Sequence, residues 1–291
     1  MKQFCTLSDK KYLKQGKALI SSLKKVHPLP CELYYLCLDD ETYAELEGED
    51  FVTRVKLSEV EQYRESILRY KKRTPYNEYC WSLASTFCRY LLEKKNVPDI
   101  LYIDSDVYFY LNPLIIYHEL GNKSIGIIRH RHNTPSSVDG EFNVGIIYFK
   151  NDSAGLSCLR WWNDCILEGS RPDLATCGDQ KYLEEFIPLY GDSVCVLDKT
   201  FAHGAPWNFR LYVYDDYFSD GSVIWGNKKQ PLVFNHFSKC LEYLRYSKCM
   251  LSMQRRLDNE NCFWYDSLQW GLCFKRVLGI CLPICYTNPY L

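Results

Sequence analysis

The sequence predicts an α/β protein with a mostly parallel central sheet, flanked by helices and followed by a helical, apolar appendage. A strand–helix–strand unit occupies residues 3–38, and apolar strands alternate with helices up to about residue 238. Beyond that point the chain becomes richer in bulky apolar side chains. Such units have right-handed crossovers and place ligands beyond the carboxyl ends of parallel strands. We expect one main domain, residues 1–238, and an appendage, residues 239–291.

The first unit begins with a strand-like run at residues 3–7. Ser8 or Asp9 is a suitable N-cap for a helix whose apolar residues recur at helical spacing up to Lys25. Pro28 and Pro30 end this helix. The remaining elements follow from the same spacing rules: strands at 32–38, 52–57, 100–103, 107–111, 124–129, 146–149 and 193–197; helices at 58–73, 78–95, 153–168 and 181–186; a hairpin at 222–225 and 231–234.

Composition excludes some classes of function. The formal net charge of the 291 residues is −1, so we expect no nucleic-acid partner. The 15 cysteines include no Cys-x-x-Cys pair, which disfavours a structural zinc site. The chain starts directly in a strand-like run, and no run of 18 apolar residues is present. We therefore expect a cytoplasmic protein with reduced thiols.

The acidic pair Asp104 and Asp106 is the most informative motif. It directly follows the apolar strand 100–103. Carboxylates one residue apart on extended backbone point to the same side, where they repel each other and lose hydration. A Mg²⁺ or Mn²⁺ ion, completed by substrate phosphates, removes that conflict. The alternative is a polar strand end with two solvated acids.

Three further polar residues are open to two interpretations each. Arg89 lies on the helix before the acidic strand and could reach an anionic ligand, or form an exposed salt bridge. Asp179 opens the helix at 181–186 and could be catalytic or a cap. His236 follows the hairpin and could be a third metal ligand or a structural histidine.

Together these residues resemble the nucleotide-sugar glycosyltransferases of the GT-A fold, and most nearly those similar to glycosyltransferase family 8. The resemblance rests on the order of the motifs between residues 3 and 239: Ser8-Asp9, Arg89, Asp104-Ser105-Asp106, Phe142-Asn143-Val144-Gly145, Gly178-Asp179-Gln180, Ala205-Pro206-Trp207-Asn208 and Phe234-Asn235-His236-Phe237. Bacterial and viral surface-glycan transferases share the later motifs. The resemblance implies a GT-A catalytic domain at 1–238.

The resemblance implies metal-dependent hexosyl transfer from a nucleotide-diphosphate sugar, most often a UDP-sugar, to a glycan or other hydroxyl acceptor. Asp104, Asp106 and His236 match the ligands of Mn²⁺ or Mg²⁺. Asp179 and Gln180 match the catalytic pair near the reacting carbon. The family leans towards retention of configuration.

The remaining matches are donor contacts. They are Thr6 and Asp9 beside the nucleotide, Arg89 at the phosphates, Ser105 between the two acids, Asn143 and Gly145 beside the sugar, and Lys239. The chain departs from the family after His236, where Phe-Ser-Lys replaces the usual Gly and Lys-Pro-Trp, so the match of Lys239 to the diphosphate-binding lysine is in doubt.

Two rival functions use the same residues. Asp104 and Asp106 also fit the nucleophile and acid of a haloacid dehalogenase-type phosphatase, although that motif belongs on the first strand of its fold. A catalytically inactive, glycan-binding homologue is the other alternative, although both acids and the histidine are present.

The appendage contains an aromatic, apolar stretch at residues 264–284 in which Lys275 and Arg276 are the only basic residues. It could pack on the catalytic domain or in a homodimer interface. Alternatively it could lie in a membrane interface, which would suit a transferase for lipid-linked glycans at the cytoplasmic face.

Overall fold

The computed structural model describes residues 1–27, 30–132, 139–175, 178–197, 199–208, 211–213 and 222–238. The predicted appendage and its stretch at 264–284 lie outside the described residues and stay predictions. Within the described part of the chain, no helix is long and apolar enough to cross a membrane. The cysteines of this part are free thiols.

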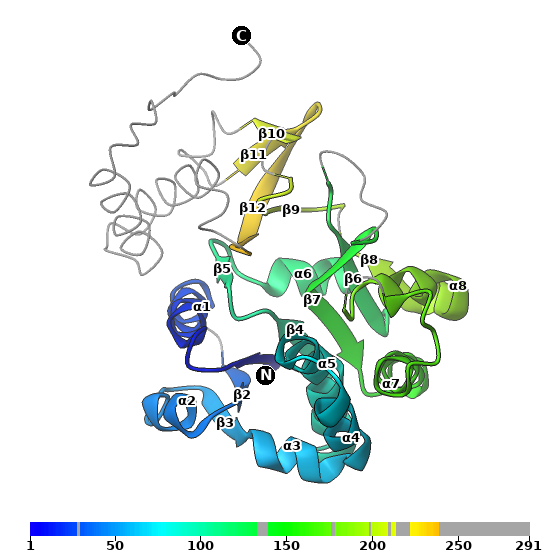
Figure 1. Ribbon diagram of the computed structural model, residues 1–291. Helices are drawn as coiled ribbons and strands as arrows, with labels where there is room; N and C mark the ends of the chain where they lie inside the picture. The colour runs from blue at the N-terminus through cyan, green and yellow to red at the C-terminus, as the bar shows by residue number, and fades with distance from the viewer. Residues whose placement is uncertain are drawn as a thin grey trace, which may run out of the picture. The chain divides into compact units, whose positions relative to one another are not determined.

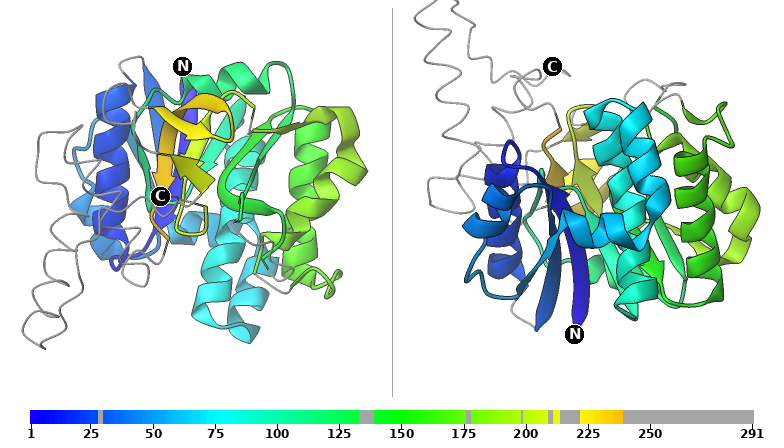
Figure 2. Two further views of the ribbon diagram at one scale, coloured as in Figure 1. Left: turned by 90° about the horizontal axis from the view of Figure 1, so that it is seen from above. Right: turned by 60° about the horizontal axis from the view of Figure 1, so that its bottom comes forward.

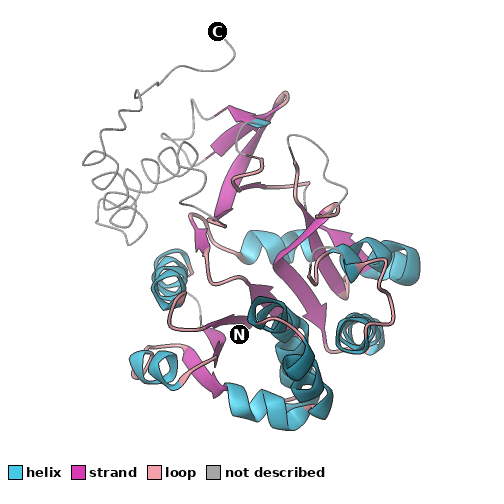
Figure 3. Cartoon of the chain, in the orientation of Figure 1, coloured by secondary structure: helices cyan, strands magenta, loops and turns pink. Residues whose placement is uncertain are grey.

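The larger sheet has seven strands: β1 (Lys2–Ser8), β2 (Cys31–Cys37), β3 (Val52–Lys56), β4 (Asp99–Ile103), β6 (Ile125–Arg129), β7 (Phe142–Lys150) and β8 (Val194–Val196). Their order is β3-β2-β1-β4-β7-β6-β8 (Figures 1 and 3). Neighbouring strands are parallel except where β7 pairs with β4 and β6. The mostly parallel sheet predicted from the sequence is confirmed.

Helices cover both faces of this sheet (Figure 2). Their bounds are α1 (Leu13–Val26), α2 (Asp40–Glu45), α3 (Leu57–Tyr63), α4 (Glu65–Arg73), α5 (Tyr76–Arg89), α6 (Leu114–Leu120), α7 (Ser153–Glu168) and α8 (Phe186–Tyr190). A π-helical turn, Tyr90–Lys94, extends α5, and 3₁₀ turns occupy Lys181–Glu185 and Gly191–Ser193.

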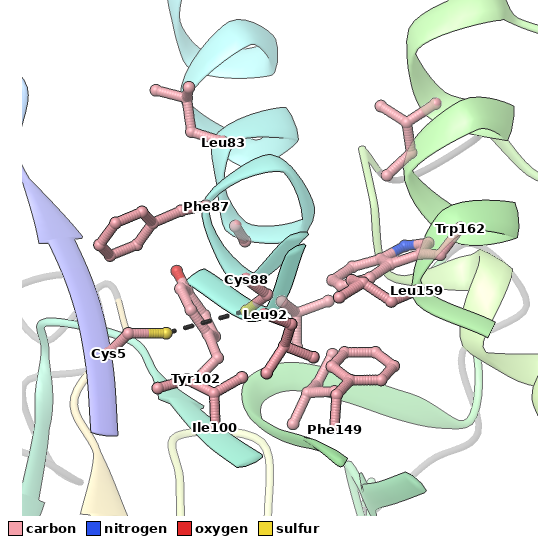
Figure 4. Packing of buried hydrophobic residues seen from close by; sticks show 14 of the residues in the cluster. Cys5, Leu83, Phe87, Cys88, Leu92, Ile100, Tyr102, Phe149, Leu159 and Trp162 are labelled. Carbon is pink, nitrogen blue, oxygen red and sulfur yellow. Dashed lines mark hydrogen bonds between the residues drawn. The ribbon is translucent and has the colours of Figure 1, made fainter. Parts of the chain in front are cut away.

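Two hydrophobic cores result from the alternation of side chains along the strands. Phe4 of β1 packs into one core with α1 and α6, and its neighbour Cys5 packs into the other with α5 and α7. Figure 4 shows the second core, where Trp162 of α7 stacks on Phe149 of β7 with ring centroids 6.0 Å apart. These cores hold β4 in the middle of the fold, where both of its faces are buried.

A smaller sheet follows the acidic motif. It contains β5 (Val107–Phe109), β9 (Ala202–Gly204), β10 (Tyr212–Val213), β11 (Ser222–Trp225) and β12 (Lys228–His236). β10, β11, β12 and β5 pair in that order, all antiparallel, and β9 pairs with β12 in parallel. The predicted hairpin is confirmed as β11 and β12. Because β4 and β5 belong to different sheets, Asp104–Asp106 lies at the junction of the two sheets.

Some predicted elements differ from the structure. The helix expected at 58–73 is divided into α3 and α4 at Arg64, whose backbone is extended and whose guanidinium binds Asp164 at 2.7 Å. The caps expected for α1 are wrong. Ser8 bonds to the hydroxyl of Tyr35 at 2.7 Å, and Asp9 accepts backbone N–H groups in a turn that precedes the helix. These polar side chains therefore order the turn after β1.

Candidate functional site

The acidic pair lies where β4 leaves the larger sheet. The backbone N–H of Asp104 donates to the carbonyl of Gly145 on β7 at 2.9 Å. The hydroxyl of Tyr102 donates to Asp104 Oδ1 at 2.8 Å, as expected for side chains two residues apart on one strand. Both contacts fix Asp104 at the end of β4.

The smaller sheet brings His236 to these acids. In the register of β5 and β12, His236 pairs with Val107, the residue after Asp106. The backbone N–H of Phe237 also donates to the carbonyl of Asp106 at 2.8 Å. His236 Nε2 consequently lies 3.0 Å from Asp106 Oδ1 and 3.5 Å from Asp104 Oδ2. The sequence predicted this grouping, and the structure brings the three side chains together.

The chemistry of these three side chains suits a divalent cation. One ligand atom from each of Asp104, Asp106 and His236 lies within 4.8 Å of the other two. Burial and the charge of Asp106 raise the pKa of Asp104, although His236 and Tyr102 oppose the rise. Burial lowers the pKa of His236, but Asp106 and Asp104 reverse this and the net shift is upward. Carboxylate oxygens and an imidazole nitrogen are ligands that Mn²⁺ accepts, and a cation would relieve the repulsion between the acids.

Asn143 on β7 connects His236 to the neighbouring polar residues. Its Oδ1 accepts the N–H of Gly145 at 2.8 Å and lies 3.2 Å from His236 Nδ1. Its Nδ2 lies 3.2 Å from His130 Nε2 and donates to Gln180 Oε1 at 3.4 Å. The four hydrogen-bonding positions of the amide are therefore all used.

Gly145 allows this close packing because it has no side chain. A Cβ atom there would lie 2.5 Å from Asn143 Oδ1 and 2.6 Å from His236 Nδ1. Both distances are well below van der Waals contact. The glycine that the sequence singled out is thus required by the approach of two polar side chains.

Asp179 is buried close to the triad. Its burial, reinforced by the charge of Asp104, raises its pKa well above the ordinary value. Its backbone carbonyl accepts the indole N–H of Trp162 at 2.9 Å, which fixes the segment against α7. The preceding Gly178 has a φ of +57°, and a Cβ atom there would meet the Trp81 ring at 2.5 Å. Asp179 is thus within electrostatic reach of Asp104, and Gln180 is hydrogen-bonded to Asn143.

The predicted nucleotide contacts lie on or near β1. Thr6 is fully buried, and its hydroxyl has no hydrogen-bond partner among the described residues. Asp9 follows β1, and its Oδ2 accepts the hydroxyl of Tyr76 at 3.2 Å. Ser105 is buried between the two acids of the motif.

Arg89 is engaged elsewhere in the structure. Its guanidinium pairs with Glu93 at 3.0 Å and with Asp164 of α7 at 2.8 Å. Its described contacts therefore connect α5 to α7 and do not include the triad. Lys239 lies outside the described residues.

Sequence reasoning assigned no role at this site to His130, and it named Trp207 only as part of the motif at 205–208. The Trp207 ring meets His236 edge to face with centroids 5.4 Å apart, and it also contacts His130 at 5.3 Å. The indole N–H of Trp207 donates to the carbonyl of His130 at 2.8 Å. The scarcity of histidine was the available signal: His130 is one of only six.

Comparisons with known proteins agree with this architecture. The uncharacterized protein YfnF of Bacillus subtilis (strain 168) is 29% identical over 250 residues, which are 81% of this chain and 80% of that protein. Mouse xyloside xylosyltransferase 1 superposes with a TM-score of 0.54 at 16% identity, over 82% of this chain and 98% of that one. No protein-family model matches the chain.

The galactosyltransferase LgtC, solved in complex with donor and acceptor sugar analogs, superposes with a TM-score of 0.52 at 14% identity. The similarity covers 86% of this chain and 95% of that one. The sheet order, the position of the acidic motif between the two sheets and these structural neighbours lead to one conclusion: the chain has the GT-A fold of nucleotide-sugar glycosyltransferases.

Proposed function

We propose that the protein is a metal-dependent glycosyltransferase. It would move a hexosyl group from a nucleotide-diphosphate sugar, with UDP as the favoured nucleotide, to a hydroxyl of a glycan acceptor, and would retain the configuration of the sugar. The observation that carries this proposal is the grouping of Asp104, Asp106 and His236 at the end of β4 in a GT-A fold. LgtC, whose structure holds donor and acceptor sugar analogs, supports the substrate class.

Asp104, Asp106 and His236 would hold the cation, Mn²⁺ or Mg²⁺. Bound there, it supplies Lewis-acid stabilisation for the charge on the departing nucleoside diphosphate. The protein fixes these ligands from two sheets through backbone hydrogen bonds to Gly145 and Phe237. Such anchoring holds the ligand atoms in place before substrate arrives.

Asp179 and Gln180 are the proposed catalytic pair. Reaction at an anomeric carbon passes through an oxocarbenium-like state, which a nearby carboxylate stabilises. The rise in the pKa of Asp179 comes from burial and from the negative charge of Asp104. Neutralising the charge on the triad weakens the second cause and favours the ionised carboxylate. Gln180 would orient the donor sugar while bonded to Asn143.

The donor would also contact residues near the carboxyl end of β1. Thr6 offers a buried hydroxyl without a described partner, and Asp9 is the proposed contact of the nucleotide. Ser105, Asn143 and Gly145 would contact the donor next to the metal. Arg89 and Lys239 are retained as predicted phosphate contacts, although the ion pairs of Arg89 favour a structural role.

A phosphatase of the haloacid dehalogenase type is less well supported. Its nucleophile belongs on the first strand, whereas Asp104 follows β4 in a different fold. An inactive homologue is disfavoured because the acids and the histidine are close enough to share a cation.

Acceptor and location stay predictions from the sequence. We retain a glycan or lipid-linked glycan acceptor, a cytoplasmic location, membrane contact through residues 264–284 and a homodimer as hypotheses. The residues that would make the membrane contact lie outside the described part of the chain.

A screen of nucleotide sugars with and without Mn²⁺ tests the proposal. Thermal unfolding should shift upward for one class of nucleotide sugar, because a ligand that binds only the folded state stabilises it. Stabilisation should disappear with a chelator. Hydrolysis of an aryl phosphate, with no response to any nucleotide sugar, would favour the phosphatase instead.

A further inference from the structure

We propose that His130 is a positioning residue for the metal ligand His236, acting through the side-chain amide of Asn143. The inference rests on the proposed function in one respect, that His236 binds a cation. A histidine binds metal through a ring nitrogen that carries no proton, and the hydrogen bond at the other nitrogen decides which one that is. The structure contains such a hydrogen bond at each step from the backbone to His236.

The first step fixes His130. Its Nδ1 lies 3.1 Å from the carbonyl oxygen of Gly140, and a carbonyl can only accept. Nδ1 therefore carries the proton. The ring is buried, and burial, with the charge of His132 adding to it, lowers its pKa to about 4, so the ring is neutral. His130 Nε2 consequently has a lone pair and faces Asn143.

The second step fixes the amide of Asn143. The backbone N–H of Gly145 can only donate, so the atom 2.8 Å from it is the oxygen Oδ1. The opposite atom, Nδ2, then donates to the lone pair of His130 Nε2, 3.2 Å away. Two backbone groups, the carbonyl of Gly140 and the N–H of Gly145, independently require the same orientation. A flipped amide would lose both contacts.

The third step fixes His236. Asn143 Oδ1 has no proton, so His236 Nδ1 must donate across the 3.2 Å between them. Nε2 is then the atom directed at Asp106, 3.0 Å away, and at Asp104. This is the arrangement that a metal-binding histidine requires. The structure describes no direct hydrogen bond between His130 and His236. The effect of His130 therefore passes through Asn143, which is hydrogen-bonded to both.

Nuclear magnetic resonance of the imidazole nitrogens in the wild-type protein tests the tautomer directly. We expect Nδ1 of His236 to stay protonated in the metal-free protein at alkaline pH and in the Mg²⁺-loaded protein. A neutral His236 ring with its proton on Nε2 would overturn the proposal. This measurement needs no donor and no activity, so its outcome is independent of the proposed function.

Variants of His130 test the effect on metal affinity, measured by calorimetric titration with Mn²⁺. H130L removes the acceptor while keeping a similar volume, and should weaken Mn²⁺ binding about tenfold, the usual cost of losing a partner behind a metal ligand. H130Q keeps an oxygen that can accept from Asn143 and should retain most of the affinity. H132L is the matched control, because His132 stacks on His130 with centroids 4.4 Å apart but its Nε2 has no hydrogen-bond partner within the described part of the chain.

Equal Mn²⁺ affinity of folded H130L and the wild type would contradict the proposal that His130 acts through Asn143 on His236. Equal losses of Mn²⁺ affinity in H130L and H132L would contradict it as well. If the wild type itself bound no Mn²⁺, the proposed function would fail, and the tautomer of His236, compared between the wild type and H130L, would still decide whether His130 positions His236. Should H130L not fold, H130Q and the wild-type spectrum carry the test.

Discussion

At the scale of single residues, the absence of a side chain at Gly145 allows Asn143 and His236 to pack closely. G145A would place a Cβ atom 2.5 Å from Asn143 Oδ1 and 2.6 Å from His236 Nδ1. We expect about tenfold weaker Mn²⁺ binding, because the contact that orients His236 is displaced, and a loss of about 1–3 kcal/mol in the free energy of unfolding from overpacking. Calorimetry and chemical denaturation measure the two effects.

G126A is the matched control for this prediction. A Cβ atom at Gly126 on β6 would lie 2.5 Å from Leu120 Cδ2, a similar overlap inside the hydrophobic core. It should reduce stability without reducing metal affinity. If both variants bound Mn²⁺ like the wild type, Gly145 would be a packing residue only.

Asp179 should show a conflict between stability and activity. Its pKa is raised in the folded protein, so the stability linked to this group is fully present below its unfolded pKa and is lost as pH rises through its folded pKa. D179N removes the buried charge. In metal-free protein at a pH above that folded pKa, D179N should raise the free energy of unfolding. Each kcal/mol gained should raise Tm by about 2–4 °C.

The same variant should lose nearly all sugar transfer, because the carboxylate proposed to stabilise the reacting sugar is gone. Thermal unfolding across a pH series from about pH 4, near the unfolded pKa of an aspartate, to about pH 8 checks the linkage, and the stability of the variant should depend less on pH than that of the wild type. D50N, at an exposed acid outside the site, serves as the control. If D179N were less stable than the wild type at the highest pH of the series, the buried carboxylate of Asp179 would not be destabilising, and this interpretation would be refuted.

At the scale of elements, Arg89 joins α5 to α7 through its ion pair with Asp164, and it also pairs with Glu93 in the turn that extends α5. Only 15% of the Arg89 side chain is exposed, so R89Q leaves two acids partly buried without this partner. We expect a loss of about 1–3 kcal/mol in the free energy of unfolding, reduced from the cost of a fully buried pair by the exposure of Asp164.

Donor affinity distinguishes the two roles considered for Arg89. Unchanged affinity of R89Q for a nucleotide sugar would assign Arg89 to structure alone. Weaker donor binding with unchanged stability would support the phosphate contact predicted from the sequence. R69Q is the control, since Arg69 forms an exposed pair with Glu65 on α4.

Much of the fold could be predicted because its elements obey local rules. The apolar run of β4, the strand-like run of β1 and the hairpin of β11 and β12 are each identified from neighbouring residues alone. The break at Arg64 could not be predicted in this way, because its partner Asp164 is 100 residues away. Contacts of that range depend on the packing of α4 against α7.

In the candidate site, too, features set by neighbouring residues could be predicted, whereas features set by long-range contacts could not. Asp104 and Asp106 are adjacent in sequence, and the resemblance linked them to His236. The role of Asn143 between His130 and His236 depends on the register of β7 and on hydrogen bonds across 13 and 93 residues. No local pattern carries that information, so the loop containing His130 gave no prediction.

At the scale of the whole molecule, the two acids lie at the junction of the larger and smaller sheets, and β12 of the smaller sheet supplies His236. A cation shared by Asp104, Asp106 and His236 would therefore connect the two sheets. The central claim is that this cation binds the diphosphate of a nucleotide sugar.

The most direct measurement is a calorimetric titration of a UDP-sugar into the wild type and D106N, each with Mn²⁺ and with a chelator. D106N removes one ligand charge and leaves packing unchanged. The account predicts donor binding by the wild type with Mn²⁺, donor affinity at least about tenfold weaker for D106N with Mn²⁺, and no donor binding by either protein with the chelator. Equal donor binding by D106N, or by the wild type without metal, would contradict it.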